Sequence, residues 1–265
     1  MKEKRFHIRA RISSNTELRP DIFLMKVVAP EVASASVPGQ FCMVRSSLVD
    51  TYDPLLARPL SIHRVDVDTG ELEFLYRVVG KGTRALSRQV PGEEITILGP
   101  LGTGFHLKPG VIPILVGGGL GVAPLLFLAQ GLKGQRGVVI IGAITKSQLL
   151  RLEPFRETGL EILVATEDGS FGNKGLVTEV LDRLLSRLDD DAKRDIEVFS
   201  CGPYPMLRAV YHLCQEYDVG CQVSMETHMA CGSGLCLGCA IEAKGGYLHV
   251  CKDGPCFRAE ELIWD

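Results

Sequence analysis

The stretch Ile112-Pro-Ile-Leu-Val-Gly-Gly-Gly-Leu-Gly-Val-Ala-Pro124 decides the fold of the second half of the chain. An apolar run of strand length leads into a glycine turn, and an apolar helical run follows it. The segment from Val111 to Leu132 has no charged residue and is long enough for a membrane span of roughly 20 residues. Its central glycines and prolines would break such a helix, so we predict a buried strand, a tight turn and a buried helix instead.

Downstream of this stretch, apolar strands alternate with helical segments. This alternation predicts a parallel sheet with helices on both faces. The expected strands are residues 112–116, 138–141, 160–165, 196–199 and 221–225, and the expected helices are residues 124–132, 176–188 and 205–217.

Upstream, the apolar runs are short, alternate with polar residues and end at Gly or Pro. This pattern predicts an antiparallel barrel or sandwich. We therefore expect three regions: a β-barrel over 1–103, an α/β domain over 104–225 and a small C-terminal region over 226–265. The expected barrel strands are residues 22–28, 40–45, 59–64, 71–79 and 93–98.

Charge argues against two classes of partner. The chain has 265 residues with 29 basic and 32 acidic side chains, a formal net charge of −3. Such a balance gives no footprint for nucleic acid or for an anionic membrane surface. The segment from Met1 to Arg11 is charged and has no apolar signal region, so we expect a cytoplasmic protein.

Cysteine spacing near the C-terminus predicts an iron–sulfur cluster. Eight of the nine cysteines fall between Cys201 and Cys256, and Cys231-Gly-Ser-Gly-Leu-Cys236-Leu-Gly-Cys239 has the C-x4-C-x2-C spacing of plant-type 2Fe-2S ferredoxins. The spacing leaves Cys251 and Cys256 as alternatives for the fourth thiolate. A structural zinc site is the competing interpretation, although zinc ligands usually come in C-x2-4-C pairs. We expect positive φ at the loop glycines, which are Gly232, Gly234 and Gly238.

Two further motifs suit nucleotide chemistry. The turn of Gly117, Gly118, Gly119 and Gly121 leaves room for a diphosphate at a helix N-terminus, but it departs from G-x-G-x-x-G and also fits an ordinary strand-to-helix turn. The stretch Arg58-Pro59-Leu60-Ser61 offers an arginine fork and a hydroxyl, which suit a flavin nucleotide but also a solvated surface. No acidic residue lies in 142–147, so these residues do not decide between NAD and NADP.

Taken in order, five motifs resemble the ferredoxin reductase family. They are Pro38-Gly39-Gln40-Phe41, Arg58 to Ser61, Gly82-Thr83, the turn from Gly117 to Pro124, and Cys201-Gly202-Pro203. The resemblance implies an FAD-binding barrel followed by a nicotinamide-binding domain, with both ring systems meeting between them. The implied FAD contacts are Arg58, Pro59, Leu60, Ser61, Leu75, Tyr76, Arg77, Gly82 and Thr83, and the implied nicotinamide contacts are the turn glycines with Cys201, Gly202 and Pro203.

The tail narrows this resemblance. Residues 226–239 together with Val250-Cys251-Lys-Asp-Gly-Pro255 resemble the electron transfer subunits of NAD-linked dihydroorotate dehydrogenase B, used in pyrimidine biosynthesis. The family pattern implies Cys231, Cys236, Cys239 and Cys251 as cluster ligands and leaves Cys256 without a role. It also implies an FMN-containing catalytic partner, two copies of each subunit, and no residue of this chain acting on an organic substrate.

Two alternatives stay open from sequence. A related reductase subunit of a hydrogenase, sulfide or ferredoxin:NADP complex would share every cofactor motif. A zinc-stabilised nucleotide-binding module without redox turnover would share only some of them.

Overall fold

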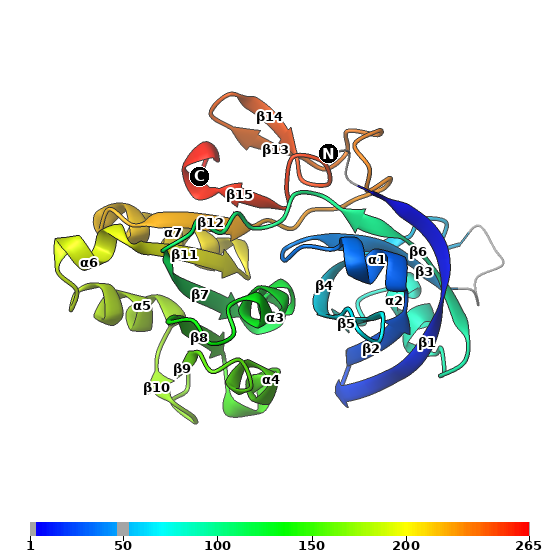
Figure 1. The fold of residues 1–265 in the computed structure, drawn as a ribbon, viewed down its shortest axis with the longest axis horizontal. Coiled ribbons are helices and arrows are strands. Elements are labelled where there is room, and N and C mark those ends of the chain that lie inside the picture. The colour runs from blue at the N-terminus through cyan, green and yellow to red at the C-terminus, as the bar shows by residue number, and fades with distance from the viewer. Residues whose placement is uncertain (1–3, 47–52, 265) are drawn as a thin grey trace. The chain divides into compact units, whose positions relative to one another are not determined.

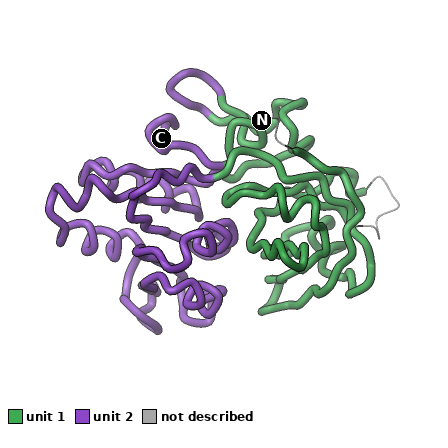
Figure 2. Tube along the Cα trace, viewed as in Figure 1, with its two compact units in different colours: residues 1–104, 226–241, 248–255 green, residues 105–225, 242–247, 256–265 purple. Residues whose placement is uncertain are grey.

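The computed structural model describes residues 4–46 and 53–264, so the first three residues of the charged N-terminal stretch lie outside the described part. The chain separates into two units, coloured in Figure 2. The first unit holds residues 1–104, 226–241 and 248–255, and the second holds residues 105–225, 242–247 and 256–265. The tail therefore contributes to both.

The first unit is built on a closed antiparallel barrel, in the order β1-β2-β5-β4-β3-β6 (Figure 1). Along β6, the fully buried Ile95 and Ile97 alternate with Glu94 and Thr96, which is the period of a strand with one face in the core. Two short helices, α1 (Pro30–Ala35) and α2 (Lys81–Ser87), accompany the barrel. The strands are β1 (Phe6–Arg19), β2 (Ile22–Val28), β3 (Phe41–Ser46), β4 (Arg58–Asp66), β5 (Glu71–Arg77) and β6 (Glu94–Leu101).

The second unit contains a seven-stranded sheet in the order β10-β9-β8-β7-β11-β12-β15. All neighbours are parallel except β15, which runs antiparallel to β12. The predicted fold class, an antiparallel barrel followed by a parallel α/β sheet, is confirmed. The strands are β7 (Ile112–Gly118), β8 (Val138–Ala143), β9 (Glu161–Thr166), β10 (Asn173–Lys174), β11 (Ile196–Cys201), β12 (Gly220–Ser224) and β15 (Cys256–Arg258).

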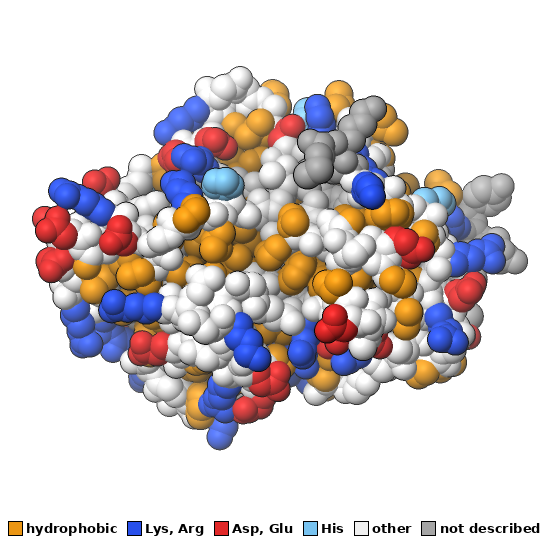
Figure 3. Space-filling model, in the orientation of Figure 1, with side chains coloured by type: hydrophobic (Ala, Val, Ile, Leu, Met, Phe, Trp, Pro, Cys, Tyr) orange, Lys and Arg blue, Asp and Glu red, His pale blue; other side chains and the backbone are white. Residues whose placement is uncertain are grey.

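Helices form two groups on this sheet. Helix α3 (Val122–Gly131) packs on β7 and β11 and contacts α4 (Leu152–Arg156), whereas α5 (Val177–Leu185) contacts α7 (Tyr204–Glu216). Two such pairs are expected when helices cover both faces of a parallel sheet. A short acidic helix, α6 (Asp190–Arg194), carries exposed carboxylates at one end of the unit (Figure 3). Within the described residues, no helix is both long and apolar enough to cross a membrane.

The tail is ordered by attachment rather than by a core of its own. The hairpin of β13 (Ala240–Ala243) and β14 (Gly246–His249) follows the cysteine loop, and β15 then extends the sheet. Trp264 stacks on Tyr204 and Tyr211 of α7, with ring centroids 5.6 Å and 5.3 Å apart. The last residues of the chain are therefore held against the second unit.

A buried polar contact holds the segment that leaves the barrel against the second sheet. The Gln222 side chain accepts a hydrogen bond from the His106 amide (2.9 Å) and donates to the His106 carbonyl (2.6 Å). It also donates to the Glu197 carboxylate at 2.8 Å. The second Glu197 oxygen is buried and has no hydrogen-bond partner within the described residues. Gln222 therefore satisfies three polar groups at once.

We expect Gln222→Leu to lower the free energy of unfolding by about 2 to 4 kcal/mol, because the buried Glu197 carboxylate and the His106 backbone groups lose their partner. The measurement is urea unfolding of the apoprotein. Gln148→Leu is the matched control, since Gln148 is exposed. Equal unfolding midpoints for the two variants would contradict the assigned role of Gln222.

Candidate functional site

The four cysteines of the C-terminal motif lie in loops of the first unit. Three of them precede β13, and Cys251 follows β14. The loop is seated on the barrel, because a Cβ at Gly232 would overlap the Met43 side chain of β3 and come within 3.5 Å of Leu101 at the end of β6. Only a glycine fits this close approach.

Backbone amides of the same loop point at the cysteine sulfurs. Amide N–H groups directed at thiolates stabilise negative charge, which is the environment that an anionic iron–sulfur cluster needs. The N–H···S contacts run from Ser233 (3.4 Å), Leu235 (3.3 Å) and Cys236 (3.4 Å) to Cys231, from Gly234 (3.1 Å) to Cys251, and from Cys251 (3.4 Å) to Cys239.

Positive φ values bend the loop so that these amides face inward. Gly232 has φ 66° and Gly234 has φ 80°, as predicted. The prediction is wrong for Gly238, because the left-handed residue at that point is Leu237, with φ 59°. A non-glycine residue in this region carries strain that the surrounding loop must offset.

The amide contacts separate Cys231 from the other shifted thiols, including Cys251, whose pKa is raised to about 12 by burial and by its hydrogen bond with Cys239. Burial alone would raise the pKa of Cys231, but hydrogen bonds from the Ser233, Cys236 and Leu235 amides outweigh it and bring the pKa to about 6. Burial raises the pKa of Cys42, and burial together with the neighbouring Cys201 raises the pKa of Cys256. A thiolate at neutral pH is the form that binds a metal.

Cys256 lies in a different environment from the four loop cysteines. It opens β15, pairs with Ser224 of β12 and belongs to the second unit. Ser224 in turn pairs with Cys201 of β11, so three small side chains share one row of the sheet. Cys251 instead contacts the loop through Gly234 and Cys239. This placement supports Cys251 over Cys256 as the fourth ligand.

Within the described ranges, no three His, Cys, Asp or Glu side chains surround a single metal position. In a 2Fe-2S cluster two irons share four protein thiolates, so four ligands need not converge on one point. The donors present, thiols with amides directed at them, fit such a cluster.

The segment after Cys251 is tied to the end of the barrel. The Thr103 amide donates to the Gly254 carbonyl (2.5 Å), and the Thr103 hydroxyl donates to the Lys252 carbonyl (3.5 Å). Thr103 also forms a parallel bridge with Pro255. The loop is thus fixed at Gly232 on one side and at Gly254 on the other.

A second group of candidate residues lies at the start of β4. A Cβ at Gly82 would overlap the Arg58 guanidinium, so the N-terminus of α2 lies directly against this side chain. The Arg58 guanidinium also donates to the carbonyls of Leu56 and Ala57. These contacts hold the guanidinium in one place, as a phosphate site requires.

Neighbouring candidates complete the arrangement. The Thr83 hydroxyl accepts hydrogen bonds from the Val79 and Gly80 amides, at 2.9 Å and 3.2 Å, and so fixes the turn before α2. Pro59 and Ser61 are half-buried, whereas Leu60 is buried in the barrel. Arg58 to Ser61, Gly82 and Thr83 are therefore brought together.

The other candidates, Leu75, Tyr76 and Arg77, lie at the end of β5, which pairs with β4. The Tyr76 ring is buried, stacks on Phe23 with centroids 5.7 Å apart, and donates to Asn15 at 3.1 Å. Burial raises the pKa of this phenol, with the Asn15 hydrogen bond opposing it. Tyr76 would therefore reach a flavin through its backbone, because its side chain belongs to the barrel core.

The motif Pro38-Gly39-Gln40-Phe41 has a structural role in the barrel. The buried Gln40 side chain donates to the Gly102 carbonyl at 2.8 Å and accepts from the Val37 amide at 2.9 Å. It thereby fixes the start of β3 against the end of β6, next to the seat of the cysteine loop.

The nucleotide candidates meet at the centre of the second sheet. Strands β7, β8 and β9 run in order to one side, and β11 and β12 lie on the other side of β7. The order therefore reverses between β7 and β11, where Gly117 pairs with Cys201. Ligands of open α/β sheets bind at such a reversal, outside the carboxyl ends of the strands.

Glycines allow close packing there. A Cβ at Gly121 would overlap the Cys201 carbonyl, and a Cβ at Gly202 would overlap the Met206 side chain. Gly119 differs, because it has φ 56° and open space where its Cβ would be. The turn thus packs tightly at Gly121 and leaves the backbone at Gly119 accessible, which suits a diphosphate.

An acidic side chain is supplied to this edge by the loop after β9. The loops after β8 and β9 are joined by hydrogen bonds from the Asp168 amide to the Ile144 carbonyl (3.2 Å) and from the Lys146 amide to the Ser170 hydroxyl (2.7 Å). Hydrogen bonds from the Ser170 hydroxyl and amide lower the pKa of Asp168. An ionised carboxylate therefore lies beside the stretch 142–147, which has none of its own.

Sequence reasoning missed the residues that seat the cysteine loop, namely Met43, Leu101 and Thr103. They lie more than a hundred residues from the motif, and an isolated methionine or threonine carries no pattern. It also missed Asp168, since the acidic residue follows the third strand of the unit rather than the second.

One family model and several known proteins match this chain. Residues 226–263 match the family described as the iron-sulfur cluster binding domain of dihydroorotate dehydrogenase B. The chain is 40% identical over 253 residues to the dihydroorotate dehydrogenase B (NAD(+)) electron transfer subunit of Desulforamulus reducens, covering 93% of this chain and 94% of that protein. It is 38% identical to the same subunit of Caldanaerobacter subterraneus subsp. tengcongensis, covering 98% of this chain and 100% of that protein.

Solved structures agree on the fold. A chain of the NADH-dependent reduced ferredoxin-NADP oxidoreductase is 31% identical, with a TM-score of 0.84 over 97% of this chain and 90% of that one. The ferredoxin reductase of carbazole 1,9a-dioxygenase, at 22% identity, has a TM-score of 0.68 over 81% of this chain and 67% of that one. On the extent and identity of the sequence matches, the chain belongs to the family of dihydroorotate dehydrogenase B (NAD(+)) electron transfer subunits.

Proposed function

We propose that this chain passes electrons between a catalytic dihydroorotate dehydrogenase subunit and NAD, using a 2Fe-2S cluster and FAD. Cys231, Cys236, Cys239 and Cys251 hold the cluster. FAD binds the barrel at Arg58 to Ser61, the end of β5 and Gly82-Thr83. NAD binds at the turn from Gly117 to Gly121 and at Cys201 to Pro203.

The observation that carries this proposal is the place of the cysteine loop on the barrel. Gly232 rests on Met43 of β3, and Met43 pairs with Pro59 of β4, one residue after Arg58. Paired residues of antiparallel strands lie about 5 Å apart. The cluster loop and the flavin motif therefore occupy neighbouring strands of one barrel, a short path for an electron.

When bound, FAD would exchange two electrons with NAD as a hydride and single electrons with the cluster. The protein's own task is to bind and orient these groups. Arg58 takes a phosphate, the Cys231 loop supplies amides toward the thiolates, and the turn at Gly119 offers backbone N–H groups to a diphosphate. No side chain is required as an acid or base on an organic substrate.

Asp168 favours NAD over NADP in this proposal. A carboxylate at this edge of the sheet can accept a hydrogen bond from a ribose 2′-hydroxyl and repels a 2′-phosphate. The preference for NAD is thus attributed to the loop after β9.

The catalytic partner, proposed to carry FMN, would meet the face that holds Cys236. Cys236 is exposed, and its neighbours Leu235 and Leu237 have exposed fractions of 83% and 57%. Exposed apolar side chains at a redox centre suit a protein contact. We propose two copies of each subunit and a cytoplasmic location, where the nine cysteines, which form no disulfide in the described residues, would stay reduced.

We expect Arg58→Ala to weaken FAD binding roughly 10- to 150-fold, which corresponds to about 1.5 to 3 kcal/mol for a lost charged hydrogen bond. Gly82→Ala should weaken it too, because the new methyl displaces the guanidinium. Fluorescence titration of the apoprotein with FAD measures both. Arg88→Ala, at an exposed arginine after α2, is the control. Unchanged affinity in Arg58→Ala would remove Arg58 from the site.

Serine substitution distinguishes the fourth ligand. We expect Cys251→Ser to lose the 2Fe-2S cluster, because its sulfur faces the loop, and Cys256→Ser to keep it. Iron and sulfide analysis with EPR of the reduced protein provides the readout. The reverse result would move the fourth ligand to Cys256, and bound zinc with no iron in the wild type would replace the cluster assignment altogether.

The complete complex tests the function itself. With dihydroorotate as donor, the wild-type complex should form NADH. A complex carrying Cys236→Ser should still reduce the partner's flavin but form NADH at a rate near the background, since the one-electron link is lost. Normal NADH formation by an assembled, cluster-less complex would contradict the proposed route.

A further inference from the structure

Lys252 is the one lysine or arginine in the tail segments of the first unit, residues 226–241 and 248–255. It directly follows Cys251. Its amide donates to the His249 carbonyl at 2.9 Å, and its carbonyl accepts from the Thr103 hydroxyl. The backbone of Lys252 is therefore fixed on both sides, which also fixes the direction in which its side chain starts.

The Lys252 side chain lies along the cysteine loop. A Cβ at Gly234 would be 3.0 to 3.3 Å from the Cβ, Cγ and Cδ atoms of Lys252. The amide of the same Gly234 donates to Cys251 Sγ at 3.1 Å. The aliphatic part of Lys252 thus packs on the residue that directs an N–H group at a ligand sulfur.

The acidic groups of these segments form no ion pair with Lys252. Asp253 interacts with His249, whose Nδ1 lies 3.5 Å from the carboxylate, and burial raises the pKa of Glu226. In the described part of the chain, Lys252 takes part in no ion pair. The side chain that packs on the cysteine loop therefore ends in an ammonium group with no carboxylate of the described residues in direct contact.

Electron uptake makes this charge matter. One electron arriving at the cluster would add one negative charge near the four sulfurs. The potentials of iron–sulfur clusters depend on nearby charge and on hydrogen bonds to the sulfurs. A cation carried on this loop stabilises the reduced form more than the oxidised form.

We propose that Lys252 is a positioning residue that raises the reduction potential of the cluster. Its stem holds Gly234 in place, and its ammonium group supplies the charge. This inference rests on the cluster assigned in the proposed function, and it adds a residue outside the four ligands that tunes their electron affinity.

The test is an EPR-monitored redox titration of the purified holoprotein. Lys252→Met keeps the stem that packs on Gly234 and removes the charge, and Lys252→Gln is a second neutral variant. Both should shift the midpoint potential downward, whereas Lys252→Arg should stay close to the wild type. The shift in Lys252→Met should shrink as salt is raised, because salt screens exposed charges.

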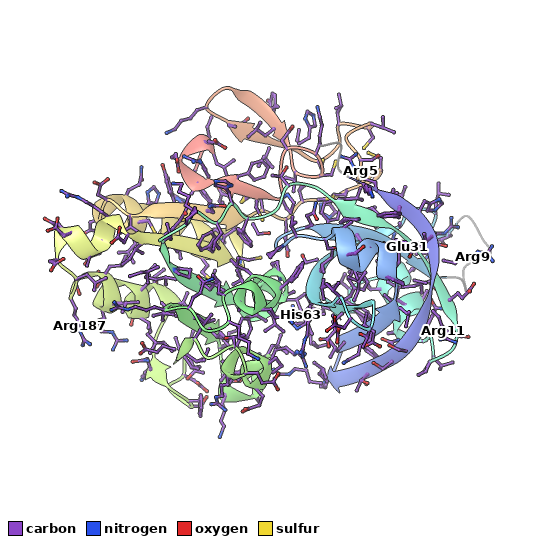
Figure 4. All side chains as sticks on the ribbon, viewed as in Figure 1. Arg5, Arg9, Arg11, Glu31, His63 and Arg187 are labelled. Carbon is purple, nitrogen blue, oxygen red and sulfur yellow. The ribbon has the colours of Figure 1, made fainter. Side chains whose placement is uncertain are left out.

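Arg11→Gln is the matched control, because it removes one positive charge from the same unit. Arg11, labelled in Figure 4, pairs with Glu94 at the start of β6, seven residues before Leu101. Seven residues of a strand span roughly 24 Å. Its midpoint potential should equal that of the wild type.

Two results would overturn the proposal. One is a midpoint potential in both neutral variants equal to that of the wild type. The other is loss of iron from both, which would make Lys252 a structural residue. A wild-type protein that binds no iron would instead defeat the cluster assignment, so the two failures are distinguishable.

Discussion

In each candidate site of this protein, a glycine lies so close to its neighbour that a Cβ would overlap it. Gly82 lies on Arg58, Gly121 on the Cys201 carbonyl and Gly232 on Met43. A side chain at any of them would push apart the two segments that build the site. The shared constraint is thus steric, and it is what allows backbone amides and cationic groups to reach the cofactors.

Because of the contact at Gly232, the barrel carries both the candidate flavin site and the cysteine loop. As an isolated fold it would offer a flavin site at β4 and α2. The contact of Gly232 with β3, together with the hydrogen bond from Thr103 to Gly254, adds the cysteine loop to the same unit. The register of β3 on β4 then determines how near the two redox sites lie.

The tail shows how a polar, glycine-rich segment becomes ordered without a core. Its pieces join whichever unit offers a partner: residues near Cys251 join the barrel, and β15 joins the edge of the sheet. Val250, Phe257 and Leu262 are buried, and amide contacts to sulfur add to this apolar packing. A metal cluster bound by these thiolates would add further order, since metal binding and folding are coupled.

The sequence by itself determined the order and type of most elements. Alternation of apolar and polar residues along a strand, and alternation of apolar strands with helical segments, can both be recognised locally in the sequence. It missed β1, the longest strand, whose exposed face carries His7, Arg9 and Arg11 and gives a weak apolar signal. It also identified the cysteine spacing and the Arg58 motif, since ligand spacing is written along the chain. Only the tertiary structure decided that Cys256 belongs to the sheet, that Leu237 rather than Gly238 turns the loop, and that Met43 and Thr103 seat it. These depend on contacts between residues far apart in sequence, and the geometry of such contacts follows from packing that no local pattern encodes.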